Sequence, residues 1–372
     1  MKKDEYFMDL ALKLALKAKG KTSPNPLVGA VIVKNNRIIG EGFHRRAGEP
    51  HAEIIALRKA GESSRGSTLF VTLEPCSHFG RTPPCVVEII KSKIKKVVIG
   101  MQDPNPINNG KSIQILRSQK IEVKVGCLEE KLRRINEDFT KYITQKIPFV
   151  TVKVAQSLDG KIAVASGESK WITSEKSRSI SHDLRKYYDA ILVGINTVLK
   201  DDPLLDCPDR EKKLYKVIVD SDLRIPLKSK IFSDASHGKI IIATTKDFTK
   251  ESKYDILAKK EVIFIKTPKK DGKVDLRYLL NQLARLEIMN VLVEGGGKVI
   301  GSMFDEGLVD KLMFFIALKI IGGNNSITSV SGKGVRFINE AIPINDIQIK
   351  NIDGDILVEG YVHRDNRKSR QC

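Results

Sequence analysis

The sequence of 372 residues has few cysteines and no long apolar run. Its longest apolar stretch, residues 312–321, is much shorter than the roughly 20 residues that a bilayer-spanning helix needs, and it contains Lys319. The five cysteines are odd in number and scattered from Cys76 to Cys372, which excludes a fully paired disulfide framework. We therefore expect no membrane segment, and a reducing, cytoplasmic location in which cysteines bind a metal or stay free.

The first residues do not resemble a secretory signal. Asp4, Glu5 and Asp9 stand where a signal would be basic. Apolar residues recur there at helical spacing, which predicts an amphipathic helix over residues 4–19. The composition, 41% hydrophobic and 29% charged, is that of a globular chain long enough for about two domains.

The formal net charge is +19. A charge of this size indicates either a polyanionic partner, such as nucleic acid or a phosphorylated small molecule, or a lysine-rich solvated surface. The lysines are spread along the whole chain without a dense basic arm, which favours the solvated surface. We expect no nucleic-acid partner and keep a phosphorylated ligand as the alternative.

Strand and helix signals alternate in the first part of the chain. Two apolar runs, residues 27–33 and 37–43, meet at Asn35-Asn36 and predict a β-hairpin. The elements expected after it are a helix over 50–60, a strand over 68–73, a helix that begins near Pro84, a strand over 96–100, a helix near 111–119, a strand over 121–125 and a helix over 128–144. This order predicts a mixed α/β sandwich.

A second domain is expected after a boundary at residue 146. Its predicted elements are strands over 149–155, 189–193, 215–219, 239–243, 261–265 and 290–293, a helix over 275–287, and β-rich segments at 312–321, 346–350 and 355–363. Such a mixture predicts a mixed sheet. We expect domains over residues 1–146 and 147–364, followed by a disordered tail over 365–372.

His51, Cys76 and Cys85 form a candidate metal site. A catalytic zinc ion takes three protein ligands and leaves a fourth position for water, whose pKa it lowers. Glu53 is the candidate that moves the proton from this water to a departing amine. His51 follows Pro50, and Cys85 follows Pro83-Pro84, which predicts that both ligands lie at helix starts.

Two other functions are compatible with these residues. A structural zinc site would need a fourth ligand, which His78 could supply. Zinc deaminases that act on nucleic-acid bases have a His-x-Glu and a Pro-Cys-x-x-Cys signature. Here eight residues, 77–84, separate the cysteines, and this argues against a nucleic-acid base as substrate.

The chain resembles the bifunctional riboflavin-biosynthesis deaminase/reductases of bacteria over nearly its whole length. The matching segments are Ser23–Gly29, Gly42–His44, His51–Glu53, Pro75–His78 with Cys85, Asp103–Pro106, Val152–Ala155, Ser157–Gly160, Ser169–Thr173, Asp201–Pro203 and Glu294–Gly296. The resemblance implies a cytidine-deaminase-like α/β/α domain and a dihydrofolate-reductase-like mixed-sheet domain.

The deaminase half of this family removes the 2-amino group of 2,5-diamino-6-ribosylamino-4(3H)-pyrimidinone 5′-phosphate as ammonia. The resemblance implies zinc on His51, Cys76 and Cys85, with Glu53 catalytic. It also implies that the substrate contacts the side chains of Asn25, His44 and Arg81. We further expect a homo-oligomer that acts on this phosphorylated pyrimidine.

The reductase half uses NADPH to convert the ribosyl group into a ribityl chain. The residues that the resemblance places at the substrate are Ser169, Arg185, Leu205 and Glu294. Those that it places at NADPH are Ala155, Trp171, Thr197, Asp201, Ser221, Gly296, Gly297, Lys298, Val299, Ile300, Gly301 and Ser302.

The residues alone say less about this second half. Glu294 and the glycines after it suit a backbone that approaches a phosphate at a helix start, although most glycine runs are only tight turns. Trp171 either stacks on a nicotinamide or fills the core. Lys153, within an apolar strand, indicates a cleft or an edge strand. Pro208 occupies a position where the family commonly has an arginine, and our hypothesis is that Arg210 replaces it. The alternative is a deaminase with an impaired reductase domain.

Overall fold

The computed structural model describes residues 3–79, 83–209, 211–233, 238–250 and 252–362. The chain divides into two compact units, residues 1–147 and 148–372. Within the described ranges, every helix is too short or too polar to traverse a bilayer. The predicted tail over 365–372 and the candidate residues Arg81 and Arg210 lie outside the described residues.

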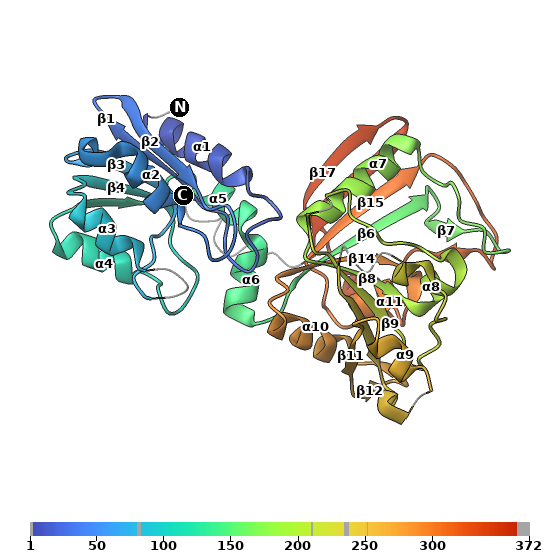
Figure 1. Ribbon diagram of the computed structural model, residues 1–372. Helices are drawn as coiled ribbons and strands as arrows, with labels where there is room; N and C mark the ends of the chain where they lie inside the picture. The colour runs from blue at the N-terminus through green and yellow to red at the C-terminus, as the bar shows by residue number, and fades with distance from the viewer. Residues whose placement is uncertain (1–2, 80–82, 210, 234–237, 251, 363–372) are drawn as a thin grey trace. The chain divides into compact units, whose positions relative to one another are not determined.

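The first unit is a five-stranded sheet with helices on both faces (Figure 1). The strand order is β2-β1-β3-β4-β5, and β1 and β2 form the predicted hairpin, with Asn35 and Asn36 at positive φ in its turn. The strands are β1 (Gly29–Lys34), β2 (Arg37–Phe43), β3 (Thr68–Leu73), β4 (Lys96–Met101) and β5 (Glu122–Val125). The helices are α1 (Lys3–Leu16), α2 (Ala52–Ala60), α3 (Cys85–Lys91), α4 (Lys111–Ser118), α5 (Glu129–Ile135) and α6 (Glu137–Gln145).

The two faces of this sheet carry different helices. Gly29 of β1 lies against Ala11 of α1, and Gly42 of β2 lies against Ala56 of α2. Because Gly29 and Gly42 belong to successive cross-strand pairs, their Cα substituents point to opposite faces. The α2 helix therefore packs on the face opposite α1, and α3 lies beside it.

One prediction for this unit is wrong. The single helix expected over 128–144 is two helices, α5 and α6, which meet at Asn136. The Asn136 side chain accepts a hydrogen bond from Leu27 N (2.7 Å) and donates one to Leu27 O (3.0 Å). These long-range bonds favour a break at Asn136 that local helical spacing does not reveal. The other predicted helices and strands of the unit are confirmed to within a few residues.

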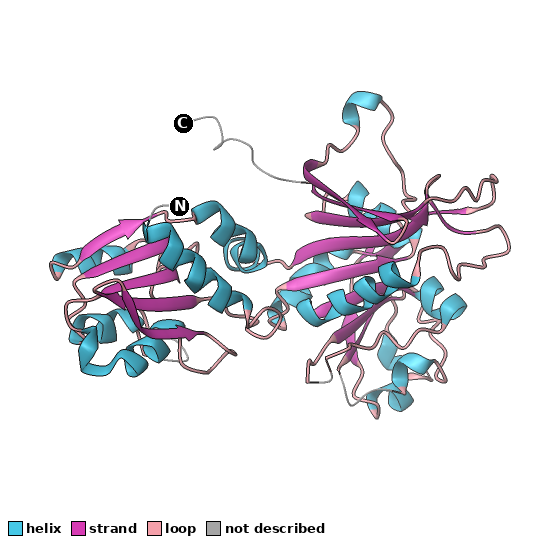
Figure 2. Cartoon of the chain, turned by 90° about the horizontal axis from the view of Figure 1, so that it is seen from above, coloured by secondary structure: helices cyan, strands magenta, loops and turns pink. Residues whose placement is uncertain are grey.

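The second unit is built on a nine-stranded mixed sheet with helices on either side, as expected (Figure 2). Its order is β11-β10-β9-β8-β14-β6-β15-β18-β17, in which β18 and β17 run antiparallel to their neighbours. The strands of this sheet are β6 (Phe149–Ser157), β8 (Ala190–Gly194), β9 (Tyr215–Val219), β10 (Ile240–Thr244), β11 (Ile263–Lys266), β14 (Asn290–Gly295), β15 (Lys311–Ala317), β17 (Asn345–Ile352) and β18 (Asp355–Tyr361). Short strands β7 (Lys161–Ala163) and β16 (Ile327–Thr328) pair with each other, as do β12 (Lys269–Lys270) and β13 (Lys273–Val274).

Helices cover both faces of the larger sheet. They are α7 (Glu175–Leu184), α8 (Ile195–Asp201), α9 (Tyr254–Ala258), α10 (Leu276–Arg285) and α11 (Gly297–Asp305). The apolar sides of α10 and α11 belong to one buried cluster, and those of α8 and α9 belong to another. The parallel strands β14, β8 and β9 end at one edge, where α11, α8 and Ser221 begin the following segments. Ligands bind at this kind of edge in parallel α/β sheets.

Candidate active sites

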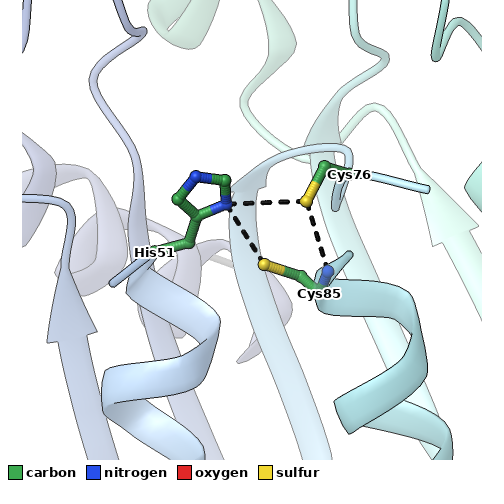
Figure 3. A group of neighbouring side chains, drawn as sticks. All are labelled: His51, Cys76 and Cys85. Carbon is green, nitrogen blue, oxygen red and sulfur yellow. Dashed lines mark hydrogen bonds between the residues drawn. The ribbon is translucent and has the colours of Figure 1, made fainter. Parts of the chain in front are cut away.

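His51, Cys76 and Cys85 come together in the first unit. His51 is the N-cap residue of α2, Cys85 is the first residue of α3, and Cys76 lies just beyond β3. Figure 3 shows the three side chains pointing toward one another from these elements. The prediction that His51 and Cys85 lie at two neighbouring helix starts is confirmed.

The spacing of these three side chains suits a zinc ion. His51 Nδ1 is 3.2 Å from Cys85 Sγ and 3.5 Å from Cys76 Sγ, and the three ligand atoms lie within 4.8 Å of one another. Usual Zn–N and Zn–S bond lengths in a tetrahedral site put such atoms about 3.5 to 3.8 Å apart. Among the described residues, His78 does not belong to this group, so nothing here supplies the fourth ligand of a structural site.

A hydrogen bond between the Cys76 and Cys85 thiols shifts the pKa of both groups. A hydrogen bond from Cys85 lowers the pKa of Cys76 to about 4, and the same bond raises the pKa of Cys85. The backbone N–H of Cys85 also donates to Cys76 Sγ over 3.2 Å. Cys76 is therefore readily ionised, as a zinc ligand must be.

Glu53 lies beside this group with an unused oxygen. Its side chain is buried, and Oε2 has no hydrogen-bond partner. Burial raises the pKa of Glu53, and the charge of His51 opposes that change. A carboxyl group with a raised pKa and a free oxygen next to candidate metal ligands is suited to accept and release a proton.

Two of the three residues expected at the pyrimidine lie at this site. The His44 ring packs edge-on against the His51 ring, with centroids 5.3 Å apart. Asn25 Nδ2 donates to His44 Nε2 over 3.0 Å, and His44 Nδ1 lies 3.3 Å from Pro50 O. Burial lowers the pKa of His44, so the neutral ring is favoured.

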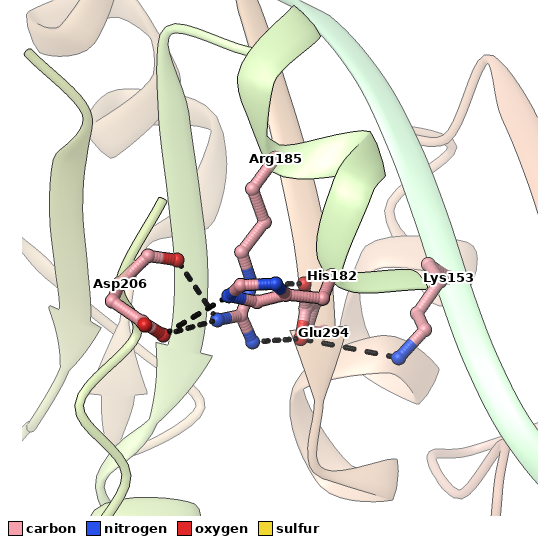
Figure 4. A network of polar contacts seen from close by, with 5 residues as sticks. All are labelled: Lys153, His182, Arg185, Asp206 and Glu294. Atoms are coloured by element: carbon pink, nitrogen blue, oxygen red, sulfur yellow. Dashed lines mark hydrogen bonds and ion pairs between the residues drawn. The ribbon is translucent and has the colours of Figure 1, made fainter. Parts of the chain in front are cut away.

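The second unit contains a largely buried ionic network (Figure 4). Arg185 donates from Nε and Nη2 to the two carboxylate oxygens of Glu294, each over 3.0 Å. Lys153 Nζ lies 4.0 Å from Glu294 Oε2, and the two side chains are only 14% and 9% exposed. Arg185 Nη1 and His182 Nε2 both lie 3.3 Å from Asp206 Oδ1. Arg185 and Glu294, both expected at the substrate, are therefore direct partners.

Lys153 is a functional candidate that neither the sequence pattern nor the resemblance placed at the substrate or at NADPH. It lies on β6, which has β14 on one side and β15 on the other, so the edge-strand interpretation is wrong. Burial lowers the pKa of Lys153, while the charge of Glu294 opposes that change. Burial would raise the pKa of Glu294, but the charges of Lys153 and Arg185 outweigh it, and the pKa is lowered. The sequence signal was a lysine inside an apolar strand.

A cavity of about 610 Å³ lies at the carboxyl edge of the parallel strands. The predicted residues that line it are Ser169, Thr197, Asp201, Ser221, Gly296, Gly297, Lys298, Val299 and Ser302. Ala155, Ile300 and Gly301, three of the positions expected at NADPH, are not among its lining residues. Ile300 packs in the core, and a Cβ at Gly301 would lie 1.5 Å from Ser331 O.

The glycine turn suits a phosphate group. Gly296 is the N-cap of α11, and the first residues of this nine-residue helix line the cavity with their N–H groups at its positive end. A Cβ at Gly297 would lie 2.2 Å from Thr328 O, so the close packing of this turn excludes a side chain. The residues present therefore fit a dinucleotide such as NADPH.

Two further expected residues lie outside the cavity lining. Trp171 is 64% exposed, so it does not fill the core, and the guanidinium of Arg178 stacks 4.3 Å from the centre of its ring. Leu205 is buried in an apolar cluster, with positive φ, next to Asp206.

Comparisons with known proteins identify relatives of both units and of the whole chain. The family model "Cytidine and deoxycytidylate deaminase zinc-binding region" matches residues 1–101, and "RibD C-terminal domain" matches residues 148–358. Riboflavin biosynthesis protein RibD of Aquifex aeolicus is 46% identical over 359 residues, which cover 95% of this chain and 97% of that protein. The RibD of Escherichia coli is 39% identical over 335 residues, 86% of this chain and 89% of that protein.

Solved structures similar to this chain belong to the same kind of protein as these relatives. Acinetobacter baumannii RibD superposes with a TM-score of 0.85 at 34% identity, over 97% of this chain and 99% of that one. A Thermotoga maritima protein described as a diaminohydroxyphosphoribosylaminopyrimidine deaminase/5-amino-6-(5-phosphoribosylamino)uracil reductase also superposes with a TM-score of 0.85, at 38% identity and with the same coverage. The expected fold classes of both units are confirmed. The chain belongs to the RibD family of riboflavin biosynthesis proteins.

Proposed function

We propose that residues 1–146 deaminate 2,5-diamino-6-ribosylamino-4(3H)-pyrimidinone 5′-phosphate and that residues 147–364 reduce the ribosyl group of the product with NADPH. The observation that carries the first step is the free, buried Glu53 Oε2 beside three candidate zinc ligands. The second step is supported by the Lys153–Glu294–Arg185 network and by the cavity that Gly296, two residues after Glu294, helps to line.

Deamination requires water to add at C2 and ammonia to leave. His51, Cys76 and Cys85 would hold zinc, which would supply a Lewis acid that makes water more acidic. Glu53 takes the proton of the water on its free oxygen and gives it to the departing amine. Neutral His44, fixed by Asn25, contacts the pyrimidine. Arg81 stays a proposed substrate contact on the family resemblance alone.

Reduction requires a hydride at C1′ of the ribosyl group and a proton on the ring oxygen that leaves C1′. The residues that line the cavity would hold NADPH, which would supply the hydride. Lys153 supplies the proton, because burial makes it give up that proton more readily than an exposed lysine does. Glu294 holds Lys153 on one side and Arg185 on the other, and Ser169 lines the cavity.

A nucleic-acid base deaminase is the competing function for the first unit. The assay that separates the two compares ammonia release from the free nucleotide with release from RNA. We expect release from the nucleotide only. Release from RNA alone would overturn the proposed substrate and favour the competing function.

The cavity also supplies a basis for the choice of NADPH over NADH. We place the hydride site near Lys153 of β6 and Glu294 of β14, and the adenosine end of the dinucleotide toward β9 and the β12–β13 hairpin. Ser221, Arg224 and Lys273 line this part of the cavity. Arg224 Nη2 donates to Asn196 Oδ1 over 2.8 Å, which orients its guanidinium. We assign Arg224 to the 2′-phosphate, which NADH lacks.

Substitution Arg224→Gln should weaken NADPH binding by about 10- to 100-fold, since one charge-assisted hydrogen bond is worth about 1.5 to 3 kcal/mol. The dissociation constant for NADH should stay unchanged. Fluorescence titration of the full chain measures both constants, and Arg277→Gln, which removes an arginine outside the cavity lining, is the matched control. An equal loss of affinity for NADPH and NADH would contradict the assignment of Arg224 to the 2′-phosphate.

We propose that two copies of the chain associate through an apolar surface on the second unit. The side chains that would form it are the exposed apolar residues of the segment 335–349, namely Val335, Phe337, Ile338, Ile342, Ile347 and Ile349. Ile347 and Ile349 lie on one face of β17, at the end of the sheet, and are 54% and 69% exposed. A two-fold axis would place this surface against itself and cover it.

Substitution Ile349→Glu should therefore convert an oligomer into a smaller species. The charge would be buried without a partner when two such surfaces meet. Sedimentation velocity measures the change, with Ile256→Glu, an exposed isoleucine of α9, as the control. An unchanged sedimentation coefficient would place the interface elsewhere.

We also propose that the protein is cytoplasmic. Cys76, Cys85, Cys127 and Cys207 are free thiols in the described part of the chain, and two of them are the candidate zinc ligands. A reducing compartment keeps such thiols available for metal.

A further inference from the structure

Two segments of the first unit, residues 74–77 and 103–112, are joined by hydrogen bonds of buried side chains next to Cys76. Glu74, at the end of β3, reaches into the segment 103–112 with both carboxylate oxygens. Its Oε2 accepts from Asp103 N (3.1 Å) and Gly110 N (2.9 Å), and its Oε1 accepts from Ser112 N (3.2 Å) and Ser112 Oγ (2.9 Å). The segment 103–112 is thereby fixed against the strand that leads to Cys76.

Asn108 returns from that segment to the loop that carries Cys76. Its Oδ1 accepts from Ser77 N (2.9 Å) and Ser77 Oγ (2.6 Å). Its Nδ2 donates to Pro75 O (3.0 Å) and to Asp103 Oδ2 (3.1 Å). Asn108 is fully buried, and both ends of its amide are used. It therefore holds the backbone on both sides of Cys76.

The other side of Cys76 is held by the start of α3. Cys85 N donates to Cys76 Sγ, and Val86 N donates to Cys76 O, each over 3.2 Å. The loop at residues 75–77 is thus fixed from two directions. Asn108 itself is not one of the three candidate ligands, so it acts on the metal site only through the backbone.

We propose that Asn108 is a positioning residue for the zinc site, which sets the place of the Cys76 sulfur relative to His51 and Cys85. This inference rests on the zinc site of the proposed function. Outer groups that orient metal ligands contribute to metal affinity because the ligands then lose less freedom on binding. Without Asn108, the N–H of Ser77 and the C=O of Pro75 lose their buried partners, and the loop gains freedom.

The test measures zinc affinity of the full chain by competition with a chelator. Asn108→Ala should lower this affinity by about 10- to 100-fold. The matched control is Asn136→Ala, which also removes a buried asparagine with two hydrogen bonds to one backbone segment, at Leu27. Asn136→Ala should keep the wild-type zinc affinity. Reduction of the deaminated substrate by the second unit should continue in both variants.

A second variant, Ser77→Ala, tests the inference if Asn108→Ala does not fold. Ser77→Ala keeps Asn108 and removes only one of its hydrogen bonds, and it should lower zinc affinity by a smaller factor. Wild-type affinity in the folded Asn108 or Ser77 variants would overturn the inference. An equal loss in Asn136→Ala would overturn it too, since general destabilisation would then explain the result. Failure of the wild-type chain to bind zinc would instead overturn the proposed function.

Discussion

Substitution Glu53→Gln should abolish deamination while the chain keeps its zinc. The amide has the shape of the carboxylate but cannot take a proton from water, and loss of a general acid–base group costs about 10²- to 10⁴-fold in rate. Because burial raises the pKa of Glu53, a neutral side chain is acceptable to the fold. Ammonia release measures the rate, and metal analysis of the same sample measures zinc.

The second unit provides the internal control for this variant. NADPH oxidation with the deaminated substrate should proceed at the wild-type rate, which shows that the second unit is folded, while retained zinc reports on the first. Deamination at an unchanged rate with zinc present would mean that Glu53 is not the proton carrier. Loss of zinc together with activity would assign Glu53 to the metal site and not to the proton transfer.

Substitution Lys153→Met should impair reduction and leave deamination unchanged, the reverse of Glu53→Gln. Reduction should fall by about 10²- to 10⁴-fold, because the group that protonates the sugar oxygen is gone. NADPH binding should persist, since Lys153 is not among the residues that line the cavity. Glu294 keeps its two hydrogen bonds to Arg185, so the carboxylate is not left unpaired.

The wild-type pH profile provides a second check on Lys153. Its pKa lies below the ordinary 10.5, and reduction should slow as the pH rises through that lowered value, because the proton is then lost. In Lys153→Met this alkaline decline should disappear from the residual rate. Lys311→Met, which removes another strand lysine paired with a carboxylate, is the control and should reduce normally. Full reductase activity in Lys153→Met would exclude the proposed role.

The zinc ligands could be predicted from sequence because each stands at a local landmark. Pro50 and Pro84 mark the starts of α2 and α3, and an apolar strand leads to Cys76, so local rules place the ligands at element ends. Their mutual approach then follows from the packing of α2 and α3 on one side of the sheet. Glu74 and Asn108 could not be found in this way, since their importance depends on hydrogen bonds to residues 36 and 33 positions away in the sequence.

In the second unit, only part of the site could be predicted from the sequence. The glycine turn before α11 was predictable from Glu294-Gly295-Gly296-Gly297, but the cavity it borders also involves residues far apart in sequence, such as Arg224 and Lys273. The run from Gly296 to Ser302, which the resemblance implies at NADPH, does not turn all of its residues toward the cavity. On α11, Ile300 and Gly301 face the core and the segment at Ser331, while Lys298, Val299 and Ser302 face the cavity.

One reaction tests the two-step function most directly. The full chain with zinc and NADPH receives the diaminopyrimidinone ribosylamino 5′-phosphate, and ammonia release and NADPH oxidation are followed together. We predict one ammonia and one oxidised NADPH for each substrate molecule, with ammonia first. Ammonia release without NADPH oxidation, or NADPH oxidation without ammonia release, would contradict the assignment of these two steps to one chain.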